Sequence, residues 1–130
     1  MRAILAAASA VALGTVIGAT GVTAHAQQPQ LKTDVTVTIK AEGTDLSGQV
    51  KTANAACAVD RTVWVWKQVG TRGGGDDKKM YSDTVGQQGT KYTWSTGNTG
   101  KQGFFYAKIG GTLNCKADTS PTVHAVRPPN

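Results

Sequence analysis

The chain has 130 residues, with 14 lysines and arginines against 8 aspartates and glutamates, and 16 glycines. This length suits one domain, and 17% charged residues is too few for a disordered acidic or basic tail. Two cysteines exclude a multi-disulfide miniprotein, and the scarcity of strong helix formers after residue 26 argues against a helical bundle.

Residues 1–26 are predicted to be a cleaved bacterial export signal. Arg2 supplies the basic start, Ala3 to Val22 is an apolar run, and Ala24-His25-Ala26 has small residues at the two positions that a signal peptidase requires. A membrane anchor is the competing interpretation, but glycines interrupt the run and no basic stop-transfer cluster follows it. Cleavage predicts a secreted, periplasmic or cell-envelope protein with no stable membrane span.

Period-two alternation predicts seven strands after the signal. Thr33 to Lys40 alternates cleanly, with Val35, Val37 and Ile39 on one face. The other strands are expected at residues 46–51, 62–69, 78–85, 90–95, 103–109 and 122–126. Glycine-rich turn signals separate them, including residues 70–77 and 86–89.

Short, closely spaced strands without a credible helix predict an all-β protein, namely a seven-stranded antiparallel Greek-key sandwich of the immunoglobulin-like or prealbumin-like kind. The sandwich is expected over residues 33–127. A flexible segment at 27–32 precedes it, and a tail at 128–130 follows it.

The two cysteines, Cys57 and Cys115, are predicted to form a disulfide in an oxidising compartment. No C-x-x-C motif is present, so a structural role is favoured over a redox role. Cys57 lies between the second and third expected strands, and Cys115 between the sixth and seventh. In a Greek-key sandwich these two connections lie at the same end, so the bridge would join loop to loop.

Several short motifs resemble one family of exported domains. They are Leu46-Ser47-Gly48-Gln49-Val50, Arg61-Thr62-Val63-Trp64-Val65, Gly89-Thr90-Lys91-Tyr92-Thr93-Trp94 and Gly103-Phe104-Phe105-Tyr106-Ala107. Together with Ser82-Asp83-Thr84 and the two cysteines, this pattern over residues 46–115 resembles the carboxypeptidase-regulatory-like group of bacterial immunoglobulin-like/prealbumin-like sandwich domains. The resemblance implies a fold and an accessory, adhesive or structural role. It implies no shared catalytic residues.

No catalytic residue is expected. His124 is the only histidine outside the predicted signal, and a Ser-His-Asp arrangement with Asp118 is formally open. However, no G-x-S-x-G or other nucleophile motif is present. An exposed histidine on an edge strand is the favoured interpretation.

Metal and cofactor binding are not expected either. Asp76-Asp77 together with Asp83 could bind calcium, but the D-x-D-x-D-G spacing is missing and Lys78-Lys79 would neutralise the site. A solvated hairpin tip is the favoured interpretation of these aspartates.

The basic balance favours acidic partners in a general way. Removal of Arg2 with the signal leaves 13 basic against 8 acidic residues, a net charge of +5. The lysines are scattered, and neither an RNA-binding motif nor a basic helix is present, so nucleic acid is not an expected partner. Solubility alone also accounts for such a charge.

The aromatic residues provide the candidate binding face. If the strands at 62–69 and 103–109 pair, Trp64, Trp66, Phe104 and Tyr106 lie together on the face opposite the core. An exposed aromatic row could stack on sugar rings or dock a partner protein. Alternatively, the N-terminal segment, a loop or a second copy covers this face, or the stems of Lys67 and Lys108 shield it.

The sequence therefore favours an exported, non-enzymatic sandwich protein that binds a protein or glycan partner at or outside the cell envelope. An inert structural or assembly module is the alternative, and a small hydrolase or hydrolase inhibitor is a more remote one. Neither the ligand nor the oligomeric state follows from the sequence.

Overall fold

The computed structural model of the protein describes residues 31–129. From Lys32 onward the chain forms one compact unit. The predicted export signal at 1–26 and most of the predicted flexible segment at 27–32 lie outside the described residues. In the described part, no helix has the length and apolar character to cross a membrane.

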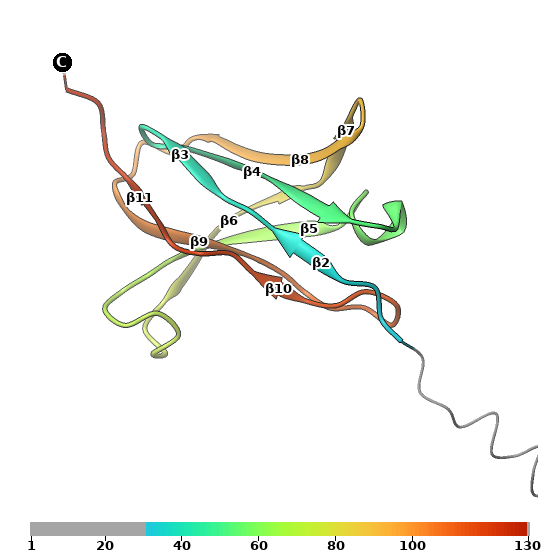
Figure 1. The fold of residues 1–130 in the computed structure, drawn as a ribbon. Coiled ribbons are helices and arrows are strands. Elements are labelled where there is room, and N and C mark those ends of the chain that lie inside the picture. The colour runs from blue at the N-terminus through green and yellow to red at the C-terminus, as the bar shows by residue number, and fades with distance from the viewer. Residues whose placement is uncertain (1–30, 130) are drawn as a thin grey trace, which may run out of the picture. The chain divides into compact units, whose positions relative to one another are not determined.

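Residues 31–129 form ten strands and one short 3₁₀-helix, η2 (Ala55–Cys57), with the strands in two antiparallel sheets (Figure 1). The first sheet contains β5 (Thr62–Lys67), β6 (Lys78–Thr84), β9 (Gly103–Ile109), β10 (Asp118–Thr119) and β11 (Val123–Ala125). The second contains β2 (Val35–Val37), β3 (Lys40–Glu42), β4 (Asp45–Thr52), β7 (Gly86–Gln88) and β8 (Lys91–Asn98). The predicted all-β antiparallel sandwich is confirmed.

Within each sheet, two short strands share one edge. Both β10 and β11 pair with β9, which pairs with β5, and β5 pairs with β6. In the second sheet β2 and β3 both pair with β4, which is followed by β8 and β7. The two longest strands, β4 and β8, therefore occupy the middle of the second sheet, whereas β6 with seven residues forms one edge of the first.

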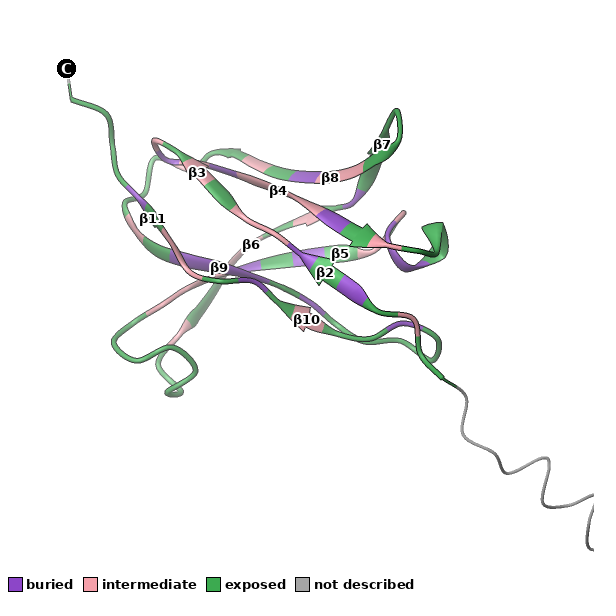
Figure 2. Ribbon diagram, in the orientation of Figure 1, coloured by how far each residue is buried: buried purple, intermediate pink, exposed green. Residues whose placement is uncertain are grey.

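The core lies between the two sheets, and the alternation of the sequence dictates which side chains enter it. Buried positions recur along β5 and β9 (Figure 2). They include Val63, Val65 and Phe105, which are fully buried, as predicted. Leu46 and Trp94 face them from the second sheet and are buried as well. Burial of each such side chain contributes about 1.5–3 kcal/mol, so these positions stabilise the sandwich.

Two of the predicted elements differ from the structure. The expected strand at 33–40 is interrupted after β2, and β3 begins only at Lys40, because the Thr38 carbonyl accepts from Trp94 Nε1 although the Thr38 amide still donates to Gln49. The expected turn at 86–89 is instead strand β7, which forms a hairpin with β8 around Gly89, a glycine at φ 62°. Strand β10 was not predicted either, since it is only two residues long.

An aspartate links the two sheets at each open edge of the sandwich. Asp118 of β10 accepts a hydrogen bond of 2.8 Å from the Val37 amide of β2. At the opposite edge, Asp83 of β6 accepts one of 2.8 Å from the Ser95 amide of β8. Such charge-assisted bonds satisfy edge amides that would otherwise be available for pairing with another chain.

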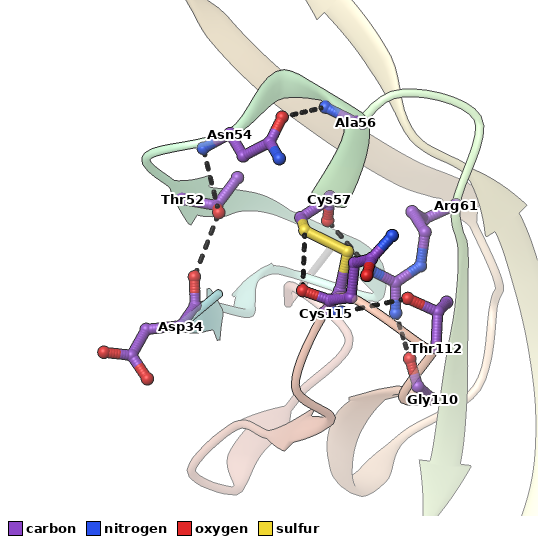
Figure 3. The surroundings of a disulfide bond; sticks show 10 residues. Asp34, Thr52, Asn54, Ala56, Cys57, Arg61, Gly110, Thr112 and Cys115 are labelled. Atoms are coloured by element: carbon purple, nitrogen blue, oxygen red, sulfur yellow. Dashed lines mark hydrogen bonds between the residues drawn. A yellow bond between two sulfur atoms is a disulfide. The ribbon is translucent and has the colours of Figure 1, made fainter. Parts of the chain in front are cut away.

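The disulfide between Cys57 and Cys115 is present and joins the β4–β5 connection to the β9–β10 connection, as predicted (Figure 3). The neighbouring Arg61 strengthens the same junction. Its guanidinium donates to the Cys57 carbonyl at 3.0 Å and to the Gly110 carbonyl. Burial lowers the pKa of Arg61, which still carries its charge at neutral pH.

Candidate binding face

The candidate site is the outer face of the first sheet. Strands β5 and β9 are paired as predicted, with Trp66 opposite Tyr106 and Trp64 opposite Lys108. Because Val65 and Ala107 point into the core, their neighbours on both strands point away from it. The structure therefore places all four predicted aromatic residues on the outer face.

Tyr106 is covered rather than exposed. The loop between β5 and β6 covers it, so that only 4% of this residue is accessible. Its hydroxyl donates to Asp77 Oδ2 at 2.5 Å, and the Arg72 guanidinium lies 4.8 Å from its ring centroid. The prediction of an exposed row of four aromatic residues is wrong at Tyr106, because a loop that is glycine-rich in sequence carries two side chains that close over the ring.

Asp77 holds this loop in place. Its carboxylate accepts hydrogen bonds of 2.9 Å from the amides of Val69 and Gly73, in addition to the Tyr106 hydroxyl. These bonds, with that from Tyr106 first, lower the pKa of Asp77 below its ordinary value. Burial, and then the hydrogen bond and negative charge of Asp77, raise the pKa of Tyr106 to about 12.

The hydrogen-bonded pair Asp77 and Tyr106 predicts that the stability of the loop depends on pH. Asp77 stabilises the folded loop at pH values above its ordinary pKa of 3.8. We expect this stabilisation to disappear as the pH falls through the lowered pKa that Asp77 has in the folded protein. Tyr106 has the corresponding effect at alkaline pH. Its contribution to the stability of the folded loop is complete below pH 10 and is lost as the pH rises towards 12.

Alkaline titration followed by tyrosinate absorbance should show one component with a midpoint of about 12. This component should be absent in Tyr106→Phe and should move to lower pH in Asp77→Asn, because the neighbouring negative charge is removed. An unchanged midpoint in Asp77→Asn would show that the contact does not exist in solution.

Trp64 and Trp66 lie next to each other on the face and are surrounded by lysines. Trp64 is 37% exposed and Trp66 is half-buried. The Lys79 ammonium lies 4.1 Å from the Trp64 centroid and 5.8 Å from the Trp66 centroid. The Lys108 ammonium lies 5.0 Å from the Trp66 centroid. All three distances are within the range of cation–π attraction.

One of the two lysines expected to shield the face does so. Lys108 covers Trp66, whereas the stem of Lys67 lies against Gly103 at the start of β9. The place of Lys79 was not predicted from the sequence, because the pairing of β5 with β6 shifts in register between Val65 and Trp66 and sets Lys79 opposite Trp66. Alternation alone does not reveal such a shift.

A hollow of about 230 Å³ opens beside these side chains. Its wall is formed by Trp64, Trp66, Lys79, Lys108, Ile109, Gly110 and residues 117–119. The Asp118 carboxylate points away towards Val37, so the charged groups that face the hollow are the two lysines. We call the two tryptophans and two lysines the Trp–Lys cluster.

Phe104 and His124 form a second aromatic group on the same face. Phe104 is 48% exposed, and its ring stacks on the His124 ring at 4.3 Å between centroids and 12° between planes. This contact follows from the pairing of β11 with β9. The covered ring of Tyr106 lies between Phe104 and the tryptophans along the face, so the exposed aromatic surface is divided in two.

The structure does not bring the candidate catalytic and calcium-binding residues together. His124 is exposed on β11, as predicted, while Asp118 accepts from Val37 on the other sheet. Asp77 and Asp83 are engaged by different amides at the β5–β6 loop and the β6 edge. Within residues 31–129 no three acidic, histidine or cysteine side chains are grouped as metal ligands.

The outer face of the second sheet carries a shallow polar groove of about 890 Å³. Ser47, Gln49, Thr93 and Ser95 line its floor, with Asp83 and Gln88 among the residues at its margin. This groove was not predicted from the sequence, because outward-facing serines, threonines and glutamines are typical of any solvated strand.

No protein-family model matches the chain, and no curated protein has significant sequence similarity to it. The resemblance to the carboxypeptidase-regulatory-like group therefore remains a prediction based on the residues.

Proposed function

We propose that this is an exported, non-enzymatic binding protein that uses the outer face of the β9–β5–β6 sheet to bind a glycan or protein partner at or outside the cell envelope. The observation that carries the proposal is the exposure of Trp64 and Phe104 on the regular outer face of a sandwich whose core is already complete. Large exposed aromatic residues on one face are characteristic of binding surfaces.

The surroundings of the tryptophans support this function because they hold the face in one arrangement. Trp66 stacks on Tyr106 with centroids 6.5 Å apart and planes 7° apart. Tyr106 is in turn fixed by Asp77 and Arg72. A face that is already ordered loses little conformational entropy when a ligand binds.

The placement of the titratable groups favours binding over catalysis. General acid–base chemistry needs a histidine or carboxylate within reach of a nucleophile or of a second such group. Here His124 stacks on Phe104, and Asp77, Asp83 and Asp118 accept from backbone amides. The expected resemblance to exported accessory domains agrees with this assignment.

Truncation of Trp64 is the direct test of the face. We expect Trp64→Ala to reduce retention on immobilised envelope polysaccharide or envelope protein at least tenfold, which corresponds to about 1.4 kcal/mol. The melting temperature should change little, because the ring is partly exposed and lies outside the core. Retention and circular dichroism melting measure the two effects.

Leu113→Ala provides the control, since this side chain is 78% exposed, lies in the β9–β10 connection and does not line the hollow. Its retention should equal that of the unmodified protein. Equal retention of Trp64→Ala would overturn the proposal and favour the inert structural module. Loss of retention in both variants would show that the effect is not specific to the face.

A further inference from the structure

We propose that the ligand of this face is an anionic glycan, with a sugar ring packed against Trp64 and Trp66 and its acidic group bound by Lys79 and Lys108. This inference rests on the proposed binding function and adds the chemical class of the ligand. It is carried by the Trp–Lys cluster, where apolar ring surface and unneutralised positive charge meet around one hollow.

The charge of the cluster is not balanced within the protein. Two ammonium groups, those of Lys79 and Lys108, approach the Trp66 ring at 5.8 Å and 5.0 Å. The ion pairs formed within residues 31–129 are Lys40–Glu42 and Lys116–Asp34, and neither involves the cluster. Neither ammonium therefore forms an ion pair with a carboxylate of the described residues, and a bound anion would supply the missing counter-ion.

The nearest carboxylates have other partners. Asp77 accepts from the Tyr106 hydroxyl and from the amides of Val69 and Gly73. Asp118 accepts from Val37 on the inner side of the sheet. The two lysines therefore remain available for a carboxylate or sulfate that is brought by a ligand, and their flexible stems allow both to reach it.

The ring surface and the size of the hollow favour a sugar as the carrier of that anion. Exposed indole surface suits the C–H face of a pyranose, and the hydroxyl of Thr119 at the wall offers a polar partner for sugar hydroxyls. The volume of about 230 Å³ lies below the roughly 300–1,000 Å³ of sites for drug-sized molecules. It suits one sugar residue of a longer chain.

Single-stranded nucleic acid is the main competitor for a basic, aromatic face. Its recognition combines successive stacking rings with a positive groove that follows many phosphates. Here Arg72 is engaged with Tyr106 and Thr122, which leaves Lys79 and Lys108 beside the two tryptophans. Two cations beside one small hollow fit a single acidic sugar better than a continuous phosphate backbone.

Two pairs of polymers that differ mainly in charge test the inference. The dissociation constant per binding site is measured by calorimetry for polygalacturonate and its methyl ester, and for dextran sulfate and dextran. We expect at least one charged polymer to bind ten times or more tighter than its neutral partner, with affinity falling as salt increases. Trp64→Ala should weaken that binding at least tenfold.

Lysine variants separate this site from the general positive charge of the protein. The double variant Lys79→Gln/Lys108→Gln should bind the charged polymer only as tightly as the neutral polymer of the same pair. Lys51→Gln with Lys91→Gln, which removes two exposed charges from β4 and β8 in the other sheet, is the matched control and should bind as the unmodified protein does.

Each remaining result overturns the inference. Equal binding of the charged and neutral polymers, or undiminished binding by Trp64→Ala, would exclude a combined sugar and anion site. Equally tight binding of oligo-deoxythymidine or polyglutamate would show that the sugar is not recognised. If no polymer binds but an envelope fraction is still retained through Trp64, the inference fails and the proposed function stands.

Discussion

Removal of the disulfide is expected to lower the free energy of unfolding by about 4 kcal/mol, based on the loss of a cross-link that closes a loop of 58 residues. Domains of this size are stable by roughly 5–15 kcal/mol in total. The Cys57→Ala/Cys115→Ala protein should therefore unfold at a much lower urea concentration than the oxidised protein.

The position of the bridge increases its importance for the fold. Next to Cys115, Thr33 forms two backbone hydrogen bonds, with Asn114 at 2.8 Å and Lys116 at 2.9 Å. These bonds attach the start of the second sheet to a connection of the first. Since β2 has only three residues, its alignment depends on anchoring at this end, and we expect its amides to lose hydrogen-exchange protection first.

Urea unfolding of the double variant, compared with the oxidised protein, measures the effect. Leu113→Ala is a useful control, because it alters an exposed side chain in the same connection and should leave stability nearly unchanged. A difference between double variant and oxidised protein below about 1 kcal/mol would contradict the loop-closure argument.

Most of the fold could be predicted from alternation. The expected strand at 103–109 coincides with β9, and the inward positions of Val63, Val65 and Phe105 are as predicted. These features follow from local sequence, because side chains alternate between the two sides of a strand. Strands β7 and β10 could not be predicted in this way, since each is only two or three residues long and depends on its neighbour.

The candidate face was only partly predictable, for a similar reason. Alternation sets Trp64 and Trp66 on the outer side, but the covering of Tyr106 depends on the hydrogen bond that its hydroxyl donates to Asp77, which lies 29 residues away in the sequence. The place of Lys79 depends on a register shift. Both features arise from tertiary contacts, and no periodic pattern in the sequence records them.

A third tertiary feature explains the division of the expected strand at 33–40. The Thr38 carbonyl accepts a hydrogen bond of 3.1 Å from Trp94 Nε1 instead of pairing in the ladder. The Thr38 hydroxyl replaces the Thr38 carbonyl as the acceptor in the ladder, and the Gln49 amide donates to it at 2.9 Å. This exchange brings the Thr38 backbone and the indole against Gly48, which leaves no space for a side chain there.

Gly48→Ala is therefore expected to lower the free energy of unfolding by about 3 kcal/mol. A Cβ at this position would overlap the Thr38 carbonyl oxygen and lie 2.8 Å from Trp94 Nε1. Relief of the overlap requires movement of backbone in the middle of the second sheet, and such overpacking typically costs about 1–3 kcal/mol. Loss of the buried indole bond adds a penalty of similar size, so the estimate lies at the upper end.

Gly86→Ala separates the steric effect from the general effect of replacing glycine. A Cβ at Gly86 would meet no atom within 4 Å. Neither glycine has a positive φ, so alanine suits both backbones equally. Gly86→Ala should change stability by only a few tenths of a kcal/mol, and urea unfolding followed by tryptophan fluorescence measures both variants. Equal stability of the two would mean that Trp94 does not pack against Thr38 and Gly48 in solution.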